Sequence, residues 1–573
     1  MPDFIQKRAE LTARLYVDPH NPHRYLARGL IHEQLGFGDL ASADAYRSLS
    51  LLESVVDPDS CEFHARRRIS EEKPTGGQDN GDGDEEEEDD DDDEDDAYAP
   101  ITQQEYDALI GDVYALLVRS LVSCGCFRDA FEFCVRGLAI LDDATGSTTA
   151  TKTLQEQMEI IKQVYISKRP QKSTTDDVEI DPSALDAQGF ARRVLYPWNE
   201  HEPDRKSPET LQLLNERLKD VAPKCEVRAV ALPALHGSTT EANPNDNPEV
   251  SIQLGLFARE DIAPGEIILR ETSLLTATNR LHDDLCDACN APLPDLASEN
   301  PPVACADCAD IVFCSQACHD TAQEVYHGAV CGLMENLESI GKDVPDPKDK
   351  ADYLYLLLLG RALAMAATQD VHPLDLPEIK YIWGDFHEYL SGEGTTAAQK
   401  EGGDPDPIAA LPFSFQLNVL QPMRFLEEME LDPYASLPRY DTWVLNTLYA
   451  KFRGTASGRL STWDGGPELC AVHPLWCLAN HSCDPNVRWE WGGEITFRAR
   501  SEAERPVWTK RNKDSADGGP PSSRRPGEGI KADEEILNHY CDVGLDVKER
   551  REWARGALGG WCLCDRCMWE ADE

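Results

Sequence analysis

The chain has 573 residues, of which 105 are acidic and 55 are basic, so its formal net charge is −50 at pH 7. A charge of this sign excludes a general binder of DNA or of anionic membranes and favours basic partners. The length is enough for roughly three or four domains of ~150 residues each.

The sequence begins without the apolar segment of a secretion signal, and its longest apolar run, 353–367, is interrupted by Arg361. We therefore expect a soluble, unsecreted protein of the nucleus or the cytoplasm, without a membrane span. Most of its nineteen cysteines stand in short metal-type spacings. In a chain without a secretion signal, zinc explains such cysteines better than disulfides do.

Residues 1–170 predict a helical region. From Asn21, small and aromatic residues follow a pattern that suits a helix–turn–helix unit of about 34 residues, and a second copy begins near Tyr106. Both copies resemble tetratricopeptide repeats, and this resemblance implies a surface for peptide partners. Generic helical hairpins remain the alternative, because two copies are few for a repeat array.

An acidic insert, 71–98, separates the two copies. It contains thirteen consecutive acidic residues at 84–96, whose mutual repulsion and lack of apolar side chains predict disorder. The tract is either a solvated spacer or an electrostatic attractant for a basic peptide tail. After the second copy, residues 171–222 are polar with scattered prolines, which predicts a linker.

Strands are predicted next. One covers 225–232, and 253–269 contains two apolar strands joined by a turn at Pro264 and Gly265. Gly255 and Leu256 lie in the first strand of this pair. Farther along, 333–457 predicts a mainly helical insert.

Eight metal-type ligands stand between these strands and the helical insert, at 286–331. Pairs two or three residues apart can bind one ion without backbone strain, and thiolates favour zinc. The pattern resembles the MYND zinc finger, in which the pairs interleave. This resemblance implies two ions, one held by Cys286, Cys289, Cys314 and Cys318 and one by Cys305, Cys308, His327 and Cys331. Because each sphere is full, both ions are expected to be structural.

Three short segments near the end of the chain carry the chemistry. Residues 480–486 read Asn-His-Ser-Cys-Asp-Pro-Asn, a composition that forms a fixed irregular loop after the apolar run 472–479. Residues 533–540 are acidic, then apolar, and end at Tyr540; the last segment holds Trp561, Cys562, Cys564 and Cys567. In this order the three segments resemble the SET-domain protein lysine methyltransferases. A SET domain interrupted by a MYND finger resembles, more narrowly, the SET and MYND family.

The resemblance implies an α+β fold with a SET domain at 223–545, split by the finger and the helical insert, and a post-SET zinc segment at 546–573. In that family the loop and the Tyr-containing strand thread past one another as a knot. It implies an S-adenosylmethionine-dependent protein lysine N-methyltransferase that acts on histones or other basic proteins. We expect a monomer that binds no nucleic acid directly.

The resemblance also implies roles for single residues. Tyr540 is the expected catalytic residue, because its hydroxyl would position the methyl group and the amine. The cofactor site is expected to contain Gly255, Leu256, Asn480, His481, Tyr540 and Trp561. A third zinc ion is expected at Cys483, Cys562, Cys564 and Cys567. Two departures from the family, Gln253 in place of a glycine and 451–457 in place of an Asn-containing segment, keep a non-catalytic interaction scaffold as the alternative.

Overall fold

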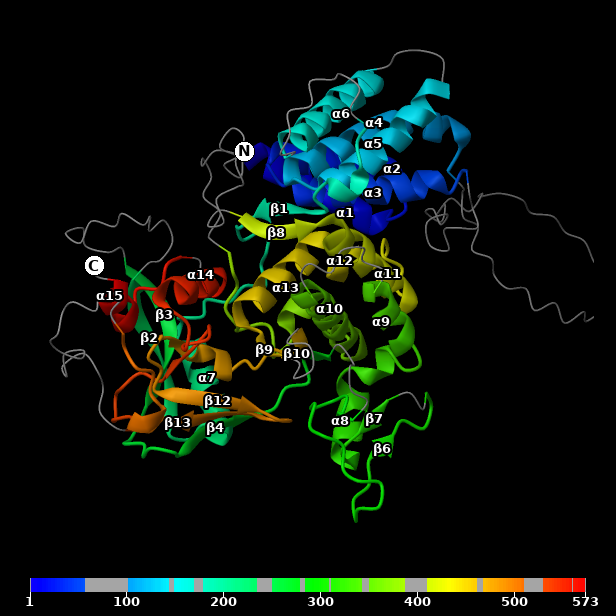
Figure 1. Ribbon diagram of the computed structural model, residues 1–573. Coiled ribbons are helices and arrows are strands. Elements are labelled where there is room, and N and C mark those ends of the chain that lie inside the picture. Colours follow the sequence, from blue (N-terminus) through cyan, green and yellow to red (C-terminus); the bar gives the residue numbers. More distant parts are fainter. Residues whose placement is uncertain are drawn as a thin grey trace, which may run out of the picture. The chain divides into compact units, whose positions relative to one another are not determined.

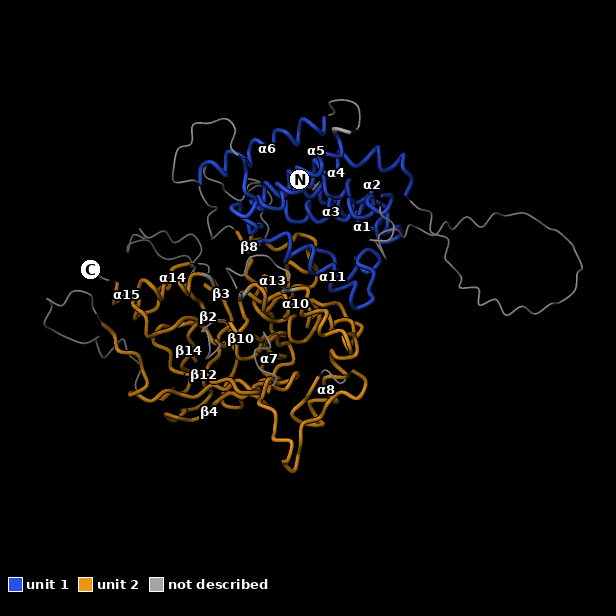
Figure 2. The backbone as a smooth tube through the Cα atoms, turned by 45° about the vertical axis from the view of Figure 1, so that its right-hand side comes forward, with its two compact units in different colours: residues 1–192, 391–396, 412–442 blue, residues 193–390, 397–411, 443–573 orange. Residues whose placement is uncertain are grey.

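The computed structural model describes residues 2–56, 101–143, 149–168, 179–233, 250–278, 284–308, 311–342, 350–386, 410–460, 467–509, 529–558 and 560–571. The acidic tract 84–96 lies outside them. They form two compact units, one from the described parts of 1–192 with 412–442 and one from those of 193–411 with 443–573 (Figure 2). In the described part, no helix is long and apolar enough to cross a membrane.

The first unit is helical at its N-terminal end, as predicted (Figure 1). Consecutive helices pack on one another, and α4 also contacts α6. The first unit contains α1 (Pro2–Val17), α2 (Pro22–Gln34), α3 (Gly38–Glu53), α4 (Gln103–Cys124), α5 (Phe127–Asp143), α6 (Thr149–Ser167), the short helix η2 (Pro182–Ala184) and strand β1 (Gln188–Arg192).

Local signals explain where these helices begin, end and touch. Thr102 and Glu105 form a capping box at the start of α4, and Gly125 ends that helix in the left-handed conformation with φ 80°. A Cβ atom at Gly29 would lie 2.9 Å from Leu116 Cδ2, so glycine permits the close approach of α2 and α4. Whether these helices are tetratricopeptide repeats stays a prediction.

Residues 412–442 belong to the first unit, although the sequence suggested a single insert at 333–457. They contain most of β8 (Ala410–Ser414), which pairs with β1, and then η6 (Gln416–Leu420), α11 (Gln421–Glu428) and α12 (Leu437–Tyr440). Their buried side chains join the helical core. The fully buried Arg28 fixes them further, because its guanidinium donates to Asp44 at 2.6 Å and to Asp441 at 3.0 Å. The helical pattern of a segment cannot reveal such a partner.

The second unit combines small sheets with helices. Its strands pair in the orders β2-β3, β12-β13-β4, β5-β10-β9, β11-β14 and β6-β7. The strands are β2 (Cys225–Pro233), β3 (Val250–Ala258), β4 (Ile267–Glu271), β5 (Thr276–Thr278), β6 (Val303–Ala304), β7 (Val312–Phe313), β9 (Ser457–Leu460), β10 (Pro467–Ala471), β11 (Asn480–His481), β12 (Val487–Trp491), β13 (Ile495–Ala499) and β14 (Leu537–Asn538). The helices are α7 (Pro208–Val221), α8 (Gln316–Val325), η3 (His327–Ala329), α9 (Met334–Lys342), α10 (Lys350–Thr368), η5 (Pro373–Asp375), α13 (Thr442–Thr455), η7 (Trp476–Leu478), η8 (Glu502–Glu504), α14 (Val547–Leu558) and α15 (Asp565–Ala571).

Helix α7 lies in the range 171–222 that the sequence suggested as a linker. Ser207 caps the helix, and Pro208 occupies its first turn, where a missing N–H costs nothing. The amide of Asn215 then donates to the Val227 carbonyl at 3.0 Å and accepts from the Val227 N–H at 2.9 Å. The proline therefore begins a packed helix in this range and does not mark a break.

Candidate active site and metal centres

The loop at 480–486 and the strand that leads to Tyr540 lie side by side. β11 pairs with β14 in parallel, with Asn480 opposite Leu537, and the Ser482 N–H donates to the Asn538 carbonyl at 2.8 Å. The Asn486 amide extends the pairing, because it donates to the Glu535 carbonyl and accepts from the Leu537 N–H, both at 2.8 Å. We call residues 479–486 with 535–541 the crossing. Side-chain amides here supply the bonds that a longer strand would supply.

Strand β3 lies against this crossing through Gly255. The Asn480 amide donates to the Leu254 carbonyl at 3.0 Å and to the Glu535 carboxylate at 2.7 Å. A Cβ atom at Gly255 would stand 2.7 Å from that same Glu535 oxygen. A larger residue at this position would displace the bonded pair of Glu535 and Asn480, and three segments far apart in the sequence meet at this glycine.

Leu256 and Gln253 have local roles in β3. Leu256 is fully buried, and its carbonyl accepts from the Ile536 N–H at 2.7 Å, so its side chain belongs to the core. Gln253 pairs with Val230 of β2 without a shift of register, and its amide donates to the Ser251 hydroxyl at 2.7 Å. The departure at 253 thus leaves the strand intact.

Tyr540 is held at both ends by the loop side of the crossing. Its hydroxyl donates to the Ala479 carbonyl at 2.9 Å, and its N–H donates to His481 Nδ1 at 3.0 Å. Burial raises the pKa of Tyr540, so the phenol stays protonated. Because the hydroxyl donates its hydrogen bond to the Ala479 carbonyl, the lone pairs of the phenol oxygen are left to accept a hydrogen bond from another group.

The structure brings the predicted metal ligands together in three sets of four. Within each set, the ligand atoms all lie within 4.8 Å of one another. The sets are Cys286, Cys289, Cys314 and Cys318; Cys305, Cys308, His327 and Cys331; and Cys483, Cys562, Cys564 and Cys567. Four soft donors, with at most one imidazole among them, suit tetrahedral zinc.

The two sets at 286–331 are tied to helix α10. The Tyr326 hydroxyl donates to Asp287 at 2.6 Å, and Arg361 of α10 donates to the same carboxylate at 3.1 Å. The Arg361 guanidinium also lies 3.7 Å from the centre of the Tyr326 ring. These contacts fasten both ligand sets to α10.

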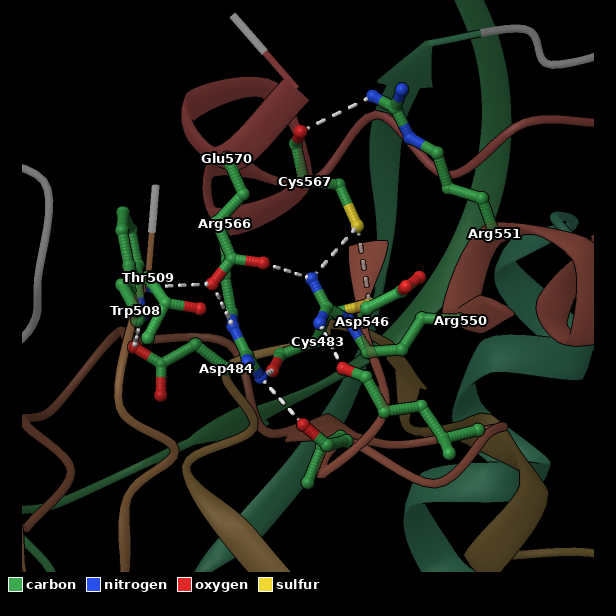
Figure 3. A network of polar contacts seen from close by, with 12 residues as sticks. Cys483, Asp484, Trp508, Thr509, Asp546, Arg550, Arg551, Arg566, Cys567 and Glu570 are labelled. Carbon is green, nitrogen blue, oxygen red and sulfur yellow. Dashed lines mark hydrogen bonds and ion pairs between the residues drawn. The ribbon is translucent and has the colours of Figure 1, made fainter. Parts of the chain in front are cut away.

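The third set joins the end of the chain to the crossing. Cys483 Sγ lies 3.4 Å from Cys567 Sγ and 4.0 Å from Cys562 Sγ. Arg566 donates to the Cys483 carbonyl at 2.8 Å, and Glu570 of the same helix accepts from Arg566 and Arg550 (Figure 3). Helix α15 is thereby held to the loop by Arg566 and the cysteines, and Glu570 ties the same helix to Arg550 of α14.

Part of the second unit is similar to a known domain family. Residues 253–505 match the family model described as SET domain. The chain contains a SET domain. The match covers less than half of the chain and ends before Tyr540 and the terminal cysteines, so the arrangement of those residues comes from the structure alone.

A curated relative is the histone-lysine N-methyltransferase SMYD3 of Mus musculus, 23% identical over 318 residues. The aligned region covers 55% of this chain and 59% of that protein, less than two thirds of the length of the relative. The SET domain and this relative confirm the resemblance to the SET and MYND family of lysine methyltransferases. Neither comparison tests the tetratricopeptide-like resemblance.

The two remaining predicted cofactor residues are Trp561 and His481, and both are rings that contact other side chains or backbone groups. The ring of Trp561 contacts Arg555, whose guanidinium lies 5.7 Å from the ring centre, and its place in the cofactor site stays a prediction. The ring of His481 uses Nδ1 for the Tyr540 N–H, and its Nε2 lies 3.4 Å from Cys483 Sγ. Burial lowers the pKa of His481 to about 4, so the ring is neutral.

Sequence reasoning missed Glu535, Asn486 and Asn538. Burial raises the pKa of Glu535, which Asn480 holds. Asn538 is fully buried, and in the described part of the chain neither polar atom of its amide has a hydrogen-bond partner. Glu535 and Asn486 read as ordinary strand and turn residues because their side-chain partners lie some 50 positions away, as in the 51-residue separation of Asn486 and Leu537.

Proposed function

We propose that this protein is an S-adenosylmethionine-dependent protein lysine N-methyltransferase. The observation that carries the proposal is the crossing, in which Asn480 and Glu535 lie against the β3 backbone at Gly255 and the Ala479 carbonyl holds the hydroxyl of Tyr540. The SET domain and the named activity of the mouse relative support the same reaction class.

The residues at the crossing fit a polar cofactor. An unpartnered buried amide such as that of Asn538 costs free energy unless a bound group or water satisfies it. Asn480 and the carboxylate of Glu535 add further polar atoms beside a glycine backbone. Asn480, Gly255 and Tyr540 are the residues that we expect to hold S-adenosylmethionine, which supplies an electrophilic methyl group when bound.

The chain would contribute alignment and exclusion of water. A lysine with its ordinary pKa of ~10.4 must lose a proton before it attacks, and the buried surroundings of Tyr540 disfavour the ammonium form. The phenol oxygen, whose proton is committed to Ala479, would orient the neutral amine and the methyl group. Alignment of this kind can supply a large part of the rate.

We propose three zinc ions, two in the finger and one in the post-SET set, and a basic protein substrate. The net charge of −50 favours a basic polypeptide such as a histone, in keeping with the histone-lysine activity in the name of the mouse relative. Because the alignment spans only part of that relative, the proposal of a basic substrate rests on charge complementarity and not on the alignment.

A non-catalytic scaffold is the second candidate, and one observation favours it. Helix α13 continues through 451–455, where the family has an Asn-containing segment, and the buried Lys451 ammonium pairs with Glu202 at 2.9 Å. That side chain is therefore committed to Glu202. This helical segment therefore differs from the Asn-containing segment that the family has at the same place.

Calorimetric titration with S-adenosylmethionine separates the two candidates. The parent is expected to bind with an affinity that Asn480→Ala weakens, because the variant loses the contacts to Leu254 and Glu535. Lys451→Met changes the helical segment 451–455 without changing a residue of the crossing. It is the matched control and should bind like the parent. A parent that binds no cofactor favours the scaffold.

A further inference from the structure

We infer that His481 is a positioning residue that transmits the state of the C-terminal metal centre to Tyr540. The imidazole lies between them: Nδ1 accepts the Tyr540 N–H at 3.0 Å, and Nε2 faces Cys483 Sγ at 3.4 Å. The ligand atoms of His481, Cys483 and Cys541 all lie within 4.8 Å of one another. Its consequence for catalysis rests on the proposed function, whereas the contacts do not.

The hydrogen-bond network assigns the tautomer of this ring. A backbone N–H can only donate, so Nδ1 must present its lone pair to Tyr540. The neutral ring then carries its proton on Nε2, which points at the sulfur of Cys483. A metal-bound cysteine is a thiolate, and a thiolate accepts a stronger hydrogen bond than a thiol does. Metal binding at Cys483 therefore strengthens the contact that orients the ring.

The orientation of the ring in turn decides the position of Tyr540. Tyr540 is anchored at its phenol hydroxyl by the Ala479 carbonyl and at its backbone N–H by the His481 ring, so both anchors belong to the same three-residue stretch. Rotation of the imidazole would release one anchor and leave the other. A small displacement of an aligned group is enough to lower a displacement rate by a large factor.

Both ring nitrogens are thus committed to protein atoms. The side chain of His481 has no remaining polar atom for a cofactor, so any contribution of this residue to cofactor binding must come from its backbone. Cys541 follows Tyr540 directly and closes the same group from the strand side. The imidazole of His481 in the loop therefore contacts both Cys483 of the metal centre and the strand that contains Tyr540.

Two substitutions separate the two halves of this contact. His481→Asn is expected to place an amide oxygen near the position of Nδ1 and so keep the acceptor for Tyr540. His481→Gln reaches the position of Nε2 and keeps the donor to Cys483. A third variant, Cys564→Ser, damages the metal set without changing the ring or its two contacts.

The experiment measures hydrogen exchange at single backbone amides in the zinc-loaded full chain. The Tyr540 amide should exchange about 10-fold faster in His481→Gln and in Cys564→Ser than in the parent, but near the parental rate in His481→Asn. The Leu537 amide, which donates to Asn486 at 2.8 Å, is the internal control and should not respond. If Cys564→Ser leaves Tyr540 exchange unchanged, or accelerates both amides equally, the inference is overturned.

Methyl-transfer kinetics add a second readout. His481→Gln should lower kcat by about 10-fold and change the KM for S-adenosylmethionine by less than about 2-fold, since no side-chain contact to the cofactor is lost. A rise in KM with kcat unchanged contradicts a positioning role. A parent without methyl transfer would overturn the proposed function alone, because the exchange result still decides whether the metal centre reaches Tyr540.

Discussion

At the scale of single residues, Glu271 holds the backbone of the segment that leads into the crossing. This buried carboxylate at the end of β4 accepts the N–H groups of Leu475 at 3.0 Å and Trp476 at 2.7 Å, just where η7 begins. Burial raises the pKa of Glu271 to about 7, despite these two bonds. The apolar run before the loop is thus held by an acid that is costly to ionise.

The sign of the resulting pH dependence follows from this shift. Between the ordinary pKa of about 4.5 and the folded value of about 7, the folded state binds more protons than the unfolded state. The free energy of unfolding therefore falls as pH rises through this window, by about 3 kcal/mol in total, and the loss is complete above it.

We predict that Glu271→Gln removes this loss, because the amide oxygen still accepts a hydrogen bond but never ionises. Denaturant unfolding at pH 5 and pH 8 measures it as the difference between parent and variant at each pH. This difference isolates Glu271 from His473, whose pKa burial lowers to about 3 and which opposes it below pH 6.5. A variant with the parental pH dependence would show that Glu271 is not the group responsible.

At the scale of elements, the meeting of β3 with β11 and β14 depends on Gly255. An alanine there would press on the Glu535 oxygen that Asn480 already holds at 2.7 Å, so the bonded pair must shift. We predict that Gly255→Ala costs about 1 kcal/mol in stability but lowers cofactor affinity about 10-fold.

The matched control for this variant is Gly458→Ala in β9. A Cβ atom at Gly458 would find its nearest neighbour, the Leu469 carbonyl, at 3.8 Å, which is an ordinary contact. Stability by thermal melting and cofactor affinity by calorimetry should both match the parent. Equal losses of affinity in the two variants would mean that a strand glycine of any kind matters, and that the contact with Glu535 does not.

Much of the second unit could be predicted at this scale, and the reasons for the failures are physical. Cysteine spacing is a local signal, so the ligand pairs at 286–331 and the three cysteines at 562–567 were readable from the sequence. The division of the eight ligands into two sets, and the addition of Cys483 to the third set, came from the family resemblance. Asn486 and Glu535 act through partners distant in the sequence, which no local pattern records. Helix α7 was missed because a proline in its first turn looks like a break. Residues 412–442 were assigned to the wrong unit because the pattern of an amphipathic helix does not show which part of the protein the helix packs on.

At the scale of the whole molecule, metal content is the simplest test of the three ligand sets. We predict three zinc ions per purified chain, and two for Cys564→Ser, because the fourth ligand of the terminal set is lost while the finger is intact. Elemental analysis after gel filtration without chelator measures this number. A count of two ions in the parent would show that one of the three ligand sets, in the terminal segment or in the finger, holds no zinc.

The same scale contains the central claim, that the crossing exists to align a methyl transfer at Tyr540. Tyr540→Phe removes one oxygen and the bond to Ala479, which should cost only ~1 kcal/mol of stability. If the oxygen acts mainly in the transition state, turnover should fall by a factor of about 100 or more while cofactor binding persists.

The most direct measurement is therefore methyl incorporation from labelled S-adenosylmethionine into a mixture of basic proteins, for the parent and Tyr540→Phe, with thermal melting in parallel. We predict that the parent transfers methyl groups to lysine and that the variant melts nearly like the parent but transfers at about 1% of its rate or less, in line with a loss of about 100-fold. A variant that melts normally and methylates at the parental rate would contradict it.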